Sequence, residues 1–183
     1  MERTRSAIIQ AFGQLLDEKP MNKITVKDIV ERCGINRNTF YYHYQDIPAL
    51  FERMMEEKVD QLLQNHFQAS QPIECILPMI QYGIAHKRAV LHVYRAIPRE
   101  TFLAYVNRIA AHFVEEYVAA ATEGHSVPSE NVAVTVHFYR CSIVGLVLDW
   151  LDAGMEYDAL ELSRRLCALF GGMGKSALSR RTG

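Results

Sequence analysis

The sequence predicts an all-α protein in which a three-helix, helix-turn-helix domain precedes a helical bundle, with about nine helices in total. Apolar residues recur at intervals of three and four along most of the chain, as they do in amphipathic helices. Two short helical patterns within residues 25–44 are joined by a glycine, which is the spacing of a helix-turn-helix. Residues 131–153 are apolar on every side of the helix axis, which indicates a helix with cover all round.

The first helix is predicted over Glu2–Glu18, and Pro20 ends it. The second helix begins after Thr25, a predicted N-cap, and Asp28 completes a near match to a capping box. It ends at Gly34, because glycine adopts the left-handed conformation of a C-terminal cap at low cost. The first helix braces the two that follow through one apolar face, formed by Ala7, Ile8, Ala11, Phe12, Leu15 and Leu16.

The helix after the turn has an unusually polar and aromatic outer surface. It is predicted over Arg37–Tyr44 with Asn36 as its N-cap, and Phe40 and Tyr44 share its buried face. Arg, Asn, Thr and Tyr side chains contact phosphates and base edges, so this surface predicts a helix that enters the DNA major groove. The alternative is that these are ordinary surface aromatics. The predicted DNA-contacting residues are Thr25, Asn36, Arg37, Asn38, Thr39, Tyr41, Tyr42 and His43.

The rest of the chain is predicted to form helices separated by short loops. Pro48 suits the first turn of a long fourth helix, and Pro98 suits the first turn of a later one. Residues 123–129 form the clearest loop of the second half. The predicted helices are residues 48 to about 67, 73–86, 87–97, 98–122, 131–153 and 158–170.

Three segments near the helix-turn-helix resemble the TetR/AcrR family of one-component repressors. They are T-V-K-D-I-V-E-R-C-G-I, F-Y-Y-H-Y and D-I-P-A-L, within about 50 N-terminal residues. A weaker resemblance, F-Y-R-C-S-I-V-G-L-V-L-D-W-L-D-A-G-M at Phe138–Met155, is similar to the C-terminal domain of a subgroup common in low-GC Gram-positive bacteria. The resemblance implies an all-helical homodimer with a DNA-binding domain in residues 1–46 and a ligand-sensing and dimerisation domain in residues 47–183.

The chain departs from the family pattern directly after the predicted DNA-contacting helix. Many members carry lysine on both sides of the aspartate there, but this chain has Gln45 and Ile47 around Asp46. Two charges that would neutralise phosphates are therefore missing. The formal net charge of the chain is −1, so we expect its affinity for DNA to depend on the local placement of charge.

The apolar helix at residues 131–153 predicts a homodimer. One domain of a chain this short has too few helices to cover that helix on every side, so a partner subunit supplies the missing cover. Two recognition helices would then read a near-palindromic operator in double-stranded DNA. The predicted interface residues are Tyr139, Ile143, Val144, Val147, Trp150, Leu162, Leu166, Leu169 and Phe170.

A small apolar or aromatic effector is expected from the resemblance, and a pocket between the C-terminal helices would bind it. The alternative for each residue is a place in the core, and the alternative for the domain is a surface that binds a partner protein, in a regulator or activator. The candidate pocket residues are Met54, Tyr82, His86, Tyr94, Tyr105, His112, His137 and Cys141.

An enzyme is not expected, since the sequence contains no G-x-S-x-G, H-E-x-x-H, G-x-x-x-x-G-K or G-x-G-x-x-G motif. No cofactor and no metal are expected, because His137 with Cys141 and His112 with Glu116 are pairs only, and a metal site needs three or four ligands. The four cysteines have no paired spacing, which indicates a reducing cytoplasm. The family resemblance implies that this is a bacterial cytoplasm, where the protein would associate with the nucleoid. No apolar run approaches membrane-spanning length, so no membrane partner is expected.

Overall fold

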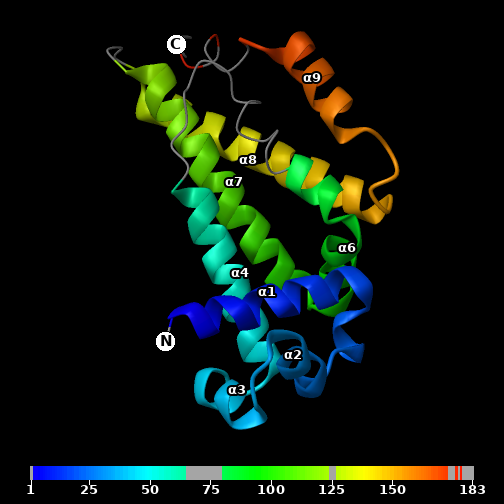
Figure 1. Ribbon diagram of the computed structural model, residues 1–183. Coiled ribbons are helices and arrows are strands. Elements are labelled where there is room, and N and C mark those ends of the chain that lie inside the picture. The colour runs from blue at the N-terminus through cyan, green and yellow to red at the C-terminus, as the bar shows by residue number, and fades with distance from the viewer. Residues whose placement is uncertain (1, 65–79, 124–126, 173–175, 177, 179–183) are drawn as a thin grey trace. The chain divides into compact units, whose positions relative to one another are not determined.

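The structure is a computed structural model that describes residues 2–64, 80–123, 127–172, 176 and 178. Within these ranges every regular element is a helix, which confirms the predicted all-α class (Figure 1). Residues 80–85 are also helical. The predicted end of the fourth helix near Phe67 and the predicted residues 73–79 lie outside the described residues. The helices are α1 (Glu2–Glu18), the short 3-10 helix η1 (Met21–Lys23), α2 (Val26–Cys33), α3 (Arg37–His43), α4 (Ile47–Leu63), α6 (Lys87–Ala96), α7 (Arg99–Thr122), α8 (Ser129–Asp152) and α9 (Ala159–Phe170).

The chain forms two compact units that are interleaved in sequence. The N-terminal unit contains residues 1–62 and 86–99, and the C-terminal unit contains residues 63–85 and 100–183. Most of α4 and all of α6 therefore belong to the same unit as the first three helices. The predicted boundary at residue 46 divides a DNA-binding domain from a ligand-sensing and dimerisation domain, and it stays a prediction.

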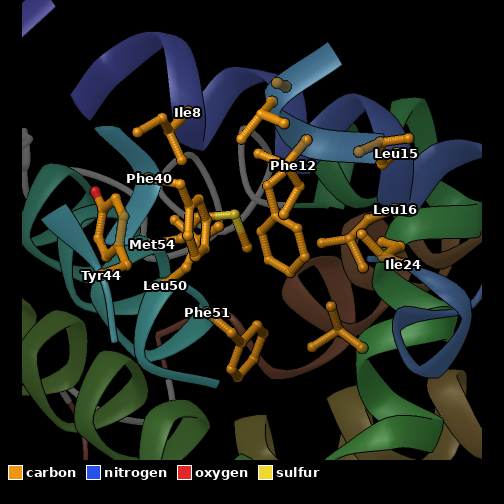
Figure 2. Packing of buried hydrophobic residues seen from close by; sticks show 14 residues of the cluster. Ile8, Phe12, Leu15, Leu16, Ile24, Phe40, Tyr44, Leu50, Phe51 and Met54 are labelled. Carbon is orange, nitrogen blue, oxygen red and sulfur yellow. The ribbon is translucent and has the colours of Figure 1, made fainter. Parts of the chain in front are cut away.

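A closed apolar core holds the N-terminal unit together. Figure 2 shows side chains from α1, α3 and α4 that converge on one cluster, among them Phe12, Phe40 and Leu50, which are completely buried. Helix α6 adds Val93 to this core and contacts both α1 and η1. The His92 imidazole lies 2.7 Å from the backbone oxygen of Leu16, at the end of α1. The first helix thus braces the next two as predicted, and α6 packs against it through the same core.

Local signals in the sequence determine the bounds of α2. The Thr25 hydroxyl accepts a hydrogen bond from the Asp28 N–H, and the Asp28 carboxylate accepts one from the Thr25 N–H at 2.7 Å, so the predicted capping box is confirmed. Lys19 also contacts that carboxylate at 2.8 Å. Hydrogen bonds from Lys19 and then from Thr25 hold the pKa of the Asp28 carboxyl well below its usual range. Gly34 ends the helix at φ 68°, the left-handed conformation predicted for it.

Two long antiparallel helices dominate the C-terminal unit. Val114, Tyr117 and Val118 of α7 form a buried cluster against which Tyr139 and Ile143 of α8 are packed. The rings of Tyr117 and Tyr139 meet edge to face with their centroids 6.1 Å apart. Burial, with a smaller contribution from Tyr139, raises the pKa of the Tyr117 hydroxyl. One face of α8 is therefore packed against α7 of the same chain.

The turn after α8 is built around Trp150, which is buried within the C-terminal unit. Its indole N–H donates a hydrogen bond to the backbone oxygen of Tyr157 at 3.2 Å. The Tyr157 hydroxyl donates to the Asp149 carboxylate at 2.9 Å, and burial followed by this bond raises the pKa of Tyr157 to about 12. A side chain at Gly83 would lie 3.4 Å from the Trp150 ring, so the helical residues 80–85 approach it closely.

The opposite face of α8 is not covered by the described part of the chain. Val134 is 69% exposed and Phe138 is 55% exposed, and the exposed Cys141 shares this face. On α9, Leu169 is 74% exposed and Phe170 is also exposed. Of the predicted interface residues, Trp150 lies in the core of its own unit, and Tyr139 and Ile143 pack toward α7. The half-buried remainder is Val144, Val147, Leu162 and Leu166.

The apolar length of α8 corrects one statement made from the sequence. Among the described residues, α8 is the one helix that is long and apolar enough to cross a membrane, by length and composition alone. The core helices of soluble proteins meet the same criterion, so this finding is weak evidence for a membrane. Polar residues such as Arg140 and Asp149 occur along the helix.

Candidate nucleic-acid interface

The helix α3 is fixed at both ends by bonds within its own segment. The Asn36 side-chain oxygen accepts hydrogen bonds from the Thr39 N–H at 2.8 Å and from the Thr39 hydroxyl at 3.1 Å, so Asn36 is the N-cap that the sequence predicts. The helix ends one residue earlier than predicted, because Tyr44 has an extended backbone and serves as the C-cap. The ends of α3 are therefore set before any contact with a partner.

The aromatic residues of α3 divide into an inner and an outer pair. Phe40 and Tyr44 are buried in the core, as predicted, and anchor the helix (Figure 2). Tyr42 is 72% exposed and Tyr41 is 55% exposed. The His43 ring meets Tyr42 edge to face at 5.2 Å. Two large side chains thus project from a helix whose other side is immobilised by packing.

The other predicted DNA-contacting residues lie close to this outer surface in sequence. Arg37 and Asn38 are exposed in the first turn of α3, and Thr39 is half-buried, with its hydroxyl bonded to the N-cap. Thr25 is exposed at the start of α2. Its hydroxyl contacts the Asp28 carboxylate at 2.7 Å. The N-terminal ends of both helices therefore present polar groups.

A groove of about 810 Å³ runs beside α3. It is lined by Arg5, Tyr42, His43, Tyr44, Gln45, Ala49 and Arg53. Arg5 comes from α1 and Arg53 from α4, and both contact the carboxylate of Glu57, at 3.2 Å and 3.0 Å. The sequence did not single out Arg53 or Glu57, because their link to α3 depends on how distant segments pack.

Comparison with known proteins identifies the fold and the family. A family model described as the transcriptional regulator C-terminal region matches residues 70–172, and one described as bacterial regulatory proteins of the tetR family matches residues 8–54. The chain belongs to the TetR family. The predicted resemblance is therefore confirmed for both halves.

Among curated relatives, an uncharacterized HTH-type transcriptional regulator, YxbF of Bacillus subtilis, is 28% identical over 167 residues. The alignment covers 88% of this chain and 43% of YxbF, so the chain spans less than half the length of that relative. The two family models describe regulators of transcription, which is the family to which this chain belongs.

Two solved structures share the fold. The dihydroxyacetone kinase operon activator DhaS superposes with a TM-score of 0.76, covering 96% of both chains at 15% identity. NalD, described as the secondary repressor of the MexAB-OprM multidrug efflux pump in Pseudomonas aeruginosa, superposes with a TM-score of 0.59 at 21% identity, covering 92% of this chain and 93% of NalD. At these identities the likeness shows the fold alone.

The predicted ligand-binding residues are divided between the two units. Met54, His86 and Tyr94 belong to the N-terminal unit, where Met54 is part of the core, the His86 imidazole lies 3.3 Å from Asp17, and the Tyr94 hydroxyl accepts a hydrogen bond from Arg99. The other five belong to the C-terminal unit: Tyr82, His137 and Cys141, which are exposed, and Tyr105 and His112, which are half-buried. The ligand site stays a prediction.

Three buried polar atoms of the C-terminal unit have no hydrogen-bond partner among the described residues. They are the Nε2 of His112 and the second carboxylate oxygen of Glu116, both on α7, and the Nε of Arg140 on α8. His112 contacts the other Glu116 oxygen at 3.4 Å, and Cys141 lies 3.7 Å from His137. Within the described ranges, no three His, Cys, Asp or Glu side chains gather as a metal site would require.

Proposed function

We propose that this TetR-family regulator is a dimeric DNA-binding repressor that is released by a small-molecule effector. The observation that carries the proposal is the outer face of α3, where Tyr41 and Tyr42 project from a helix anchored by buried Phe40 and Tyr44. A rigid helix with exposed Arg, Asn and Tyr side chains suits the major groove, because these groups bond to base edges and phosphates.

A homodimer would present two such helices to DNA. Successive major grooves on one side of B-DNA lie about 34–36 Å apart, so a two-fold symmetric protein reads a near-palindromic operator. The apolar side chains of Val134, Phe138 and Leu169 support this part of the proposal, since a symmetric partner would remove them from water.

The effector would act on the C-terminal unit. The unsatisfied polar atoms of Glu116 and Arg140 favour an effector with hydrogen-bonding groups in addition to an apolar or aromatic body. An effector that binds one arrangement of the helices better than another would change the affinity for DNA by that difference. We propose no enzymatic activity, no cofactor and no membrane partner, and we place the protein in the bacterial cytoplasm at the nucleoid.

A second candidate function is activation of transcription instead of repression. DhaS, which shares the fold with the higher TM-score, is named an operon activator, whereas NalD is named a repressor. An activator whose exposed apolar face binds another protein would use the same face of α8 that a dimer would cover. A reporter gene behind the operator decides the sign: deleting the regulator raises expression under a repressor and lowers it under an activator.

The DNA-binding proposal is tested by a mobility-shift assay with the DNA that flanks the gene. We expect Tyr42→Ala and Thr39→Ala each to weaken binding by about 1–3 kcal/mol. Ile84→Ala is the control, because Ile84 is also a large exposed side chain but belongs to the C-terminal unit. Wild-type affinity in both α3 variants would contradict the assignment of α3 as the recognition helix.

A further inference from the structure

Two arginines from different helices line the groove beside α3, and one carboxylate joins them. The Arg5 Nη2 of α1 donates to Glu57 Oε1 at 3.2 Å, and the Arg53 Nε of α4 donates to the same oxygen at 3.0 Å. Arg53 also donates to Glu56 at 3.3 Å. Tyr42 and His43 line the same groove, so these arginines lie next to the side chains proposed to contact DNA.

The charges of this cluster cancel. Arg5 and Arg53 are opposed by Glu56 and Glu57, so a groove with two arginines in its wall contributes no net positive charge. Gln45, where many family members carry lysine, also lines the groove and adds none. All four charged side chains are partly exposed, and ion pairs in solvent are held weakly, so an incoming anion can replace one partner.

We propose that Arg5 and Arg53 bind phosphates of the DNA backbone, and that Glu57 competes with those phosphates and thereby moderates the affinity. The inference rests on the proposed DNA-binding function and adds to it a phosphate site and an internal competitor. Carboxylate and phosphate oxygens offer an arginine the same paired acceptors, so one exchanges for the other without moving the helices. The groove would thus replace the two lysines that are missing around Asp46.

The test is a salt titration of binding to a duplex of generic sequence about 40 base pairs long, followed by fluorescence anisotropy. Each phosphate contact contributes about 0.9 to the slope of log K against log salt. We expect Arg53→Gln to make the slope shallower by about this amount per chain, and Arg53→Lys to retain it. Glu57→Gln should bind about twofold tighter or more at low salt, because a negative charge near the phosphates is gone.

Arg53→Gln and Glu57→Gln are chosen because, if the cluster had a purely structural role, both would change stability and DNA binding in the same direction. If the cluster only joins α1 to α4, Arg53→Gln and Glu57→Gln both lower the melting temperature and neither tightens DNA binding. Lys58→Gln is the control, since Lys58 is exposed on α4 and does not line the groove. Its slope should equal that of the wild type.

The outcomes separate this inference from the proposed function. A wild-type protein that binds neither the duplex nor its flanking DNA would overturn the DNA-binding proposal. A wild-type protein that binds, with an unchanged slope in Arg53→Gln or weaker binding in Glu57→Gln, would overturn the competitor model alone. Circular dichroism of each variant confirms that the helices are intact before the slopes are compared.

Discussion

The two units of the chain differ in how completely they bury their apolar side chains. In the N-terminal unit, the helices enclose Phe12, Phe40 and Leu50 completely, and among the described residues the large hydrophobic side chains that are exposed belong to Tyr41 and Tyr42 of α3. In the C-terminal unit, the 24-residue helices α7 and α8 cover one another on one side only, and Phe138 stays exposed. The first unit encloses its own apolar core, whereas in the second the described residues leave apolar surface uncovered.

The exposed aromatic residues of the two units suit different kinds of binding partner. Exposed aromatics in the N-terminal unit sit on a helix that carries polar groups, which suits the charged and wet surface of DNA. Those in the C-terminal unit sit on apolar helices, which suits a protein partner or a second copy of the chain. An exposed aromatic residue is therefore expected to contact DNA in the N-terminal unit and protein in the C-terminal unit. Substitutions can test this difference directly.

The largest effect is expected from breaking the closed core. Phe40→Ala removes a completely buried ring, and we expect it to lower the free energy of unfolding by about 3–5 kcal/mol. Tyr42→Ala, two residues further along the same helix, should change it by less than about 0.5 kcal/mol, because that ring is exposed. Urea denaturation of both variants measures the difference. Equal losses would show that the inner and outer faces of α3 are not distinct.

A somewhat smaller effect is expected at the open face of the C-terminal unit. Phe138→Glu places a carboxylate where the proposed dimer is apolar, and we expect self-association to weaken at least about a hundredfold with the helices retained. Ala120→Glu is the control, since it adds the same charge at an exposed position of α7. Sedimentation velocity reports the state of each variant. A Phe138→Glu protein that associates like the wild type would place the interface elsewhere.

The smallest effect concerns acid stability of the N-terminal unit. The pKa of Asp28 is depressed in the folded state, so its charge stabilises the fold above the unfolded pKa of about 3.9, and this contribution is lost as the pH falls below that value. The melting temperature of Asp28→Asn should therefore lie below that of the wild type near neutral pH, and the gap should close below about pH 4. Glu31→Gln, an exposed neighbour on α2, is the control. A gap that persists in acid would assign the effect to shape rather than charge.

The sequence predicted those features that depend on neighbours within about four residues. The Thr25–Asp28 capping box, the Asn36 cap and the left-handed Gly34 were all expected, because each is determined by local hydrogen bonds or backbone sterics. The apolar face of α1 was expected too, since helical periodicity shows which residues share a face.

Features that join distant segments were not predicted. Periodicity does not reveal which neighbour covers a face, so Trp150 was assigned to a dimer interface although it packs within its own unit. The link between Arg5 and Glu57 spans 52 positions, and nothing in the local pattern of either helix indicates it. The packing of α6 against α1 could not be predicted from the sequence for the same reason.

Gly34 has a consequence for the direction of α3, the proposed recognition helix. A side-chain carbon added there would meet nothing within 4 Å, yet φ is +68°, so the requirement at this joint is a torsion angle and not space. The amides of Gly34 and Ile35 both donate to the Val30 oxygen, which completes the joint with backbone atoms alone. The direction in which α3 leaves the turn thus depends on the left-handed backbone conformation of Gly34. A substitution at position 34 would therefore change the direction of α3 through the torsion angle that the new residue prefers, and not through a steric clash.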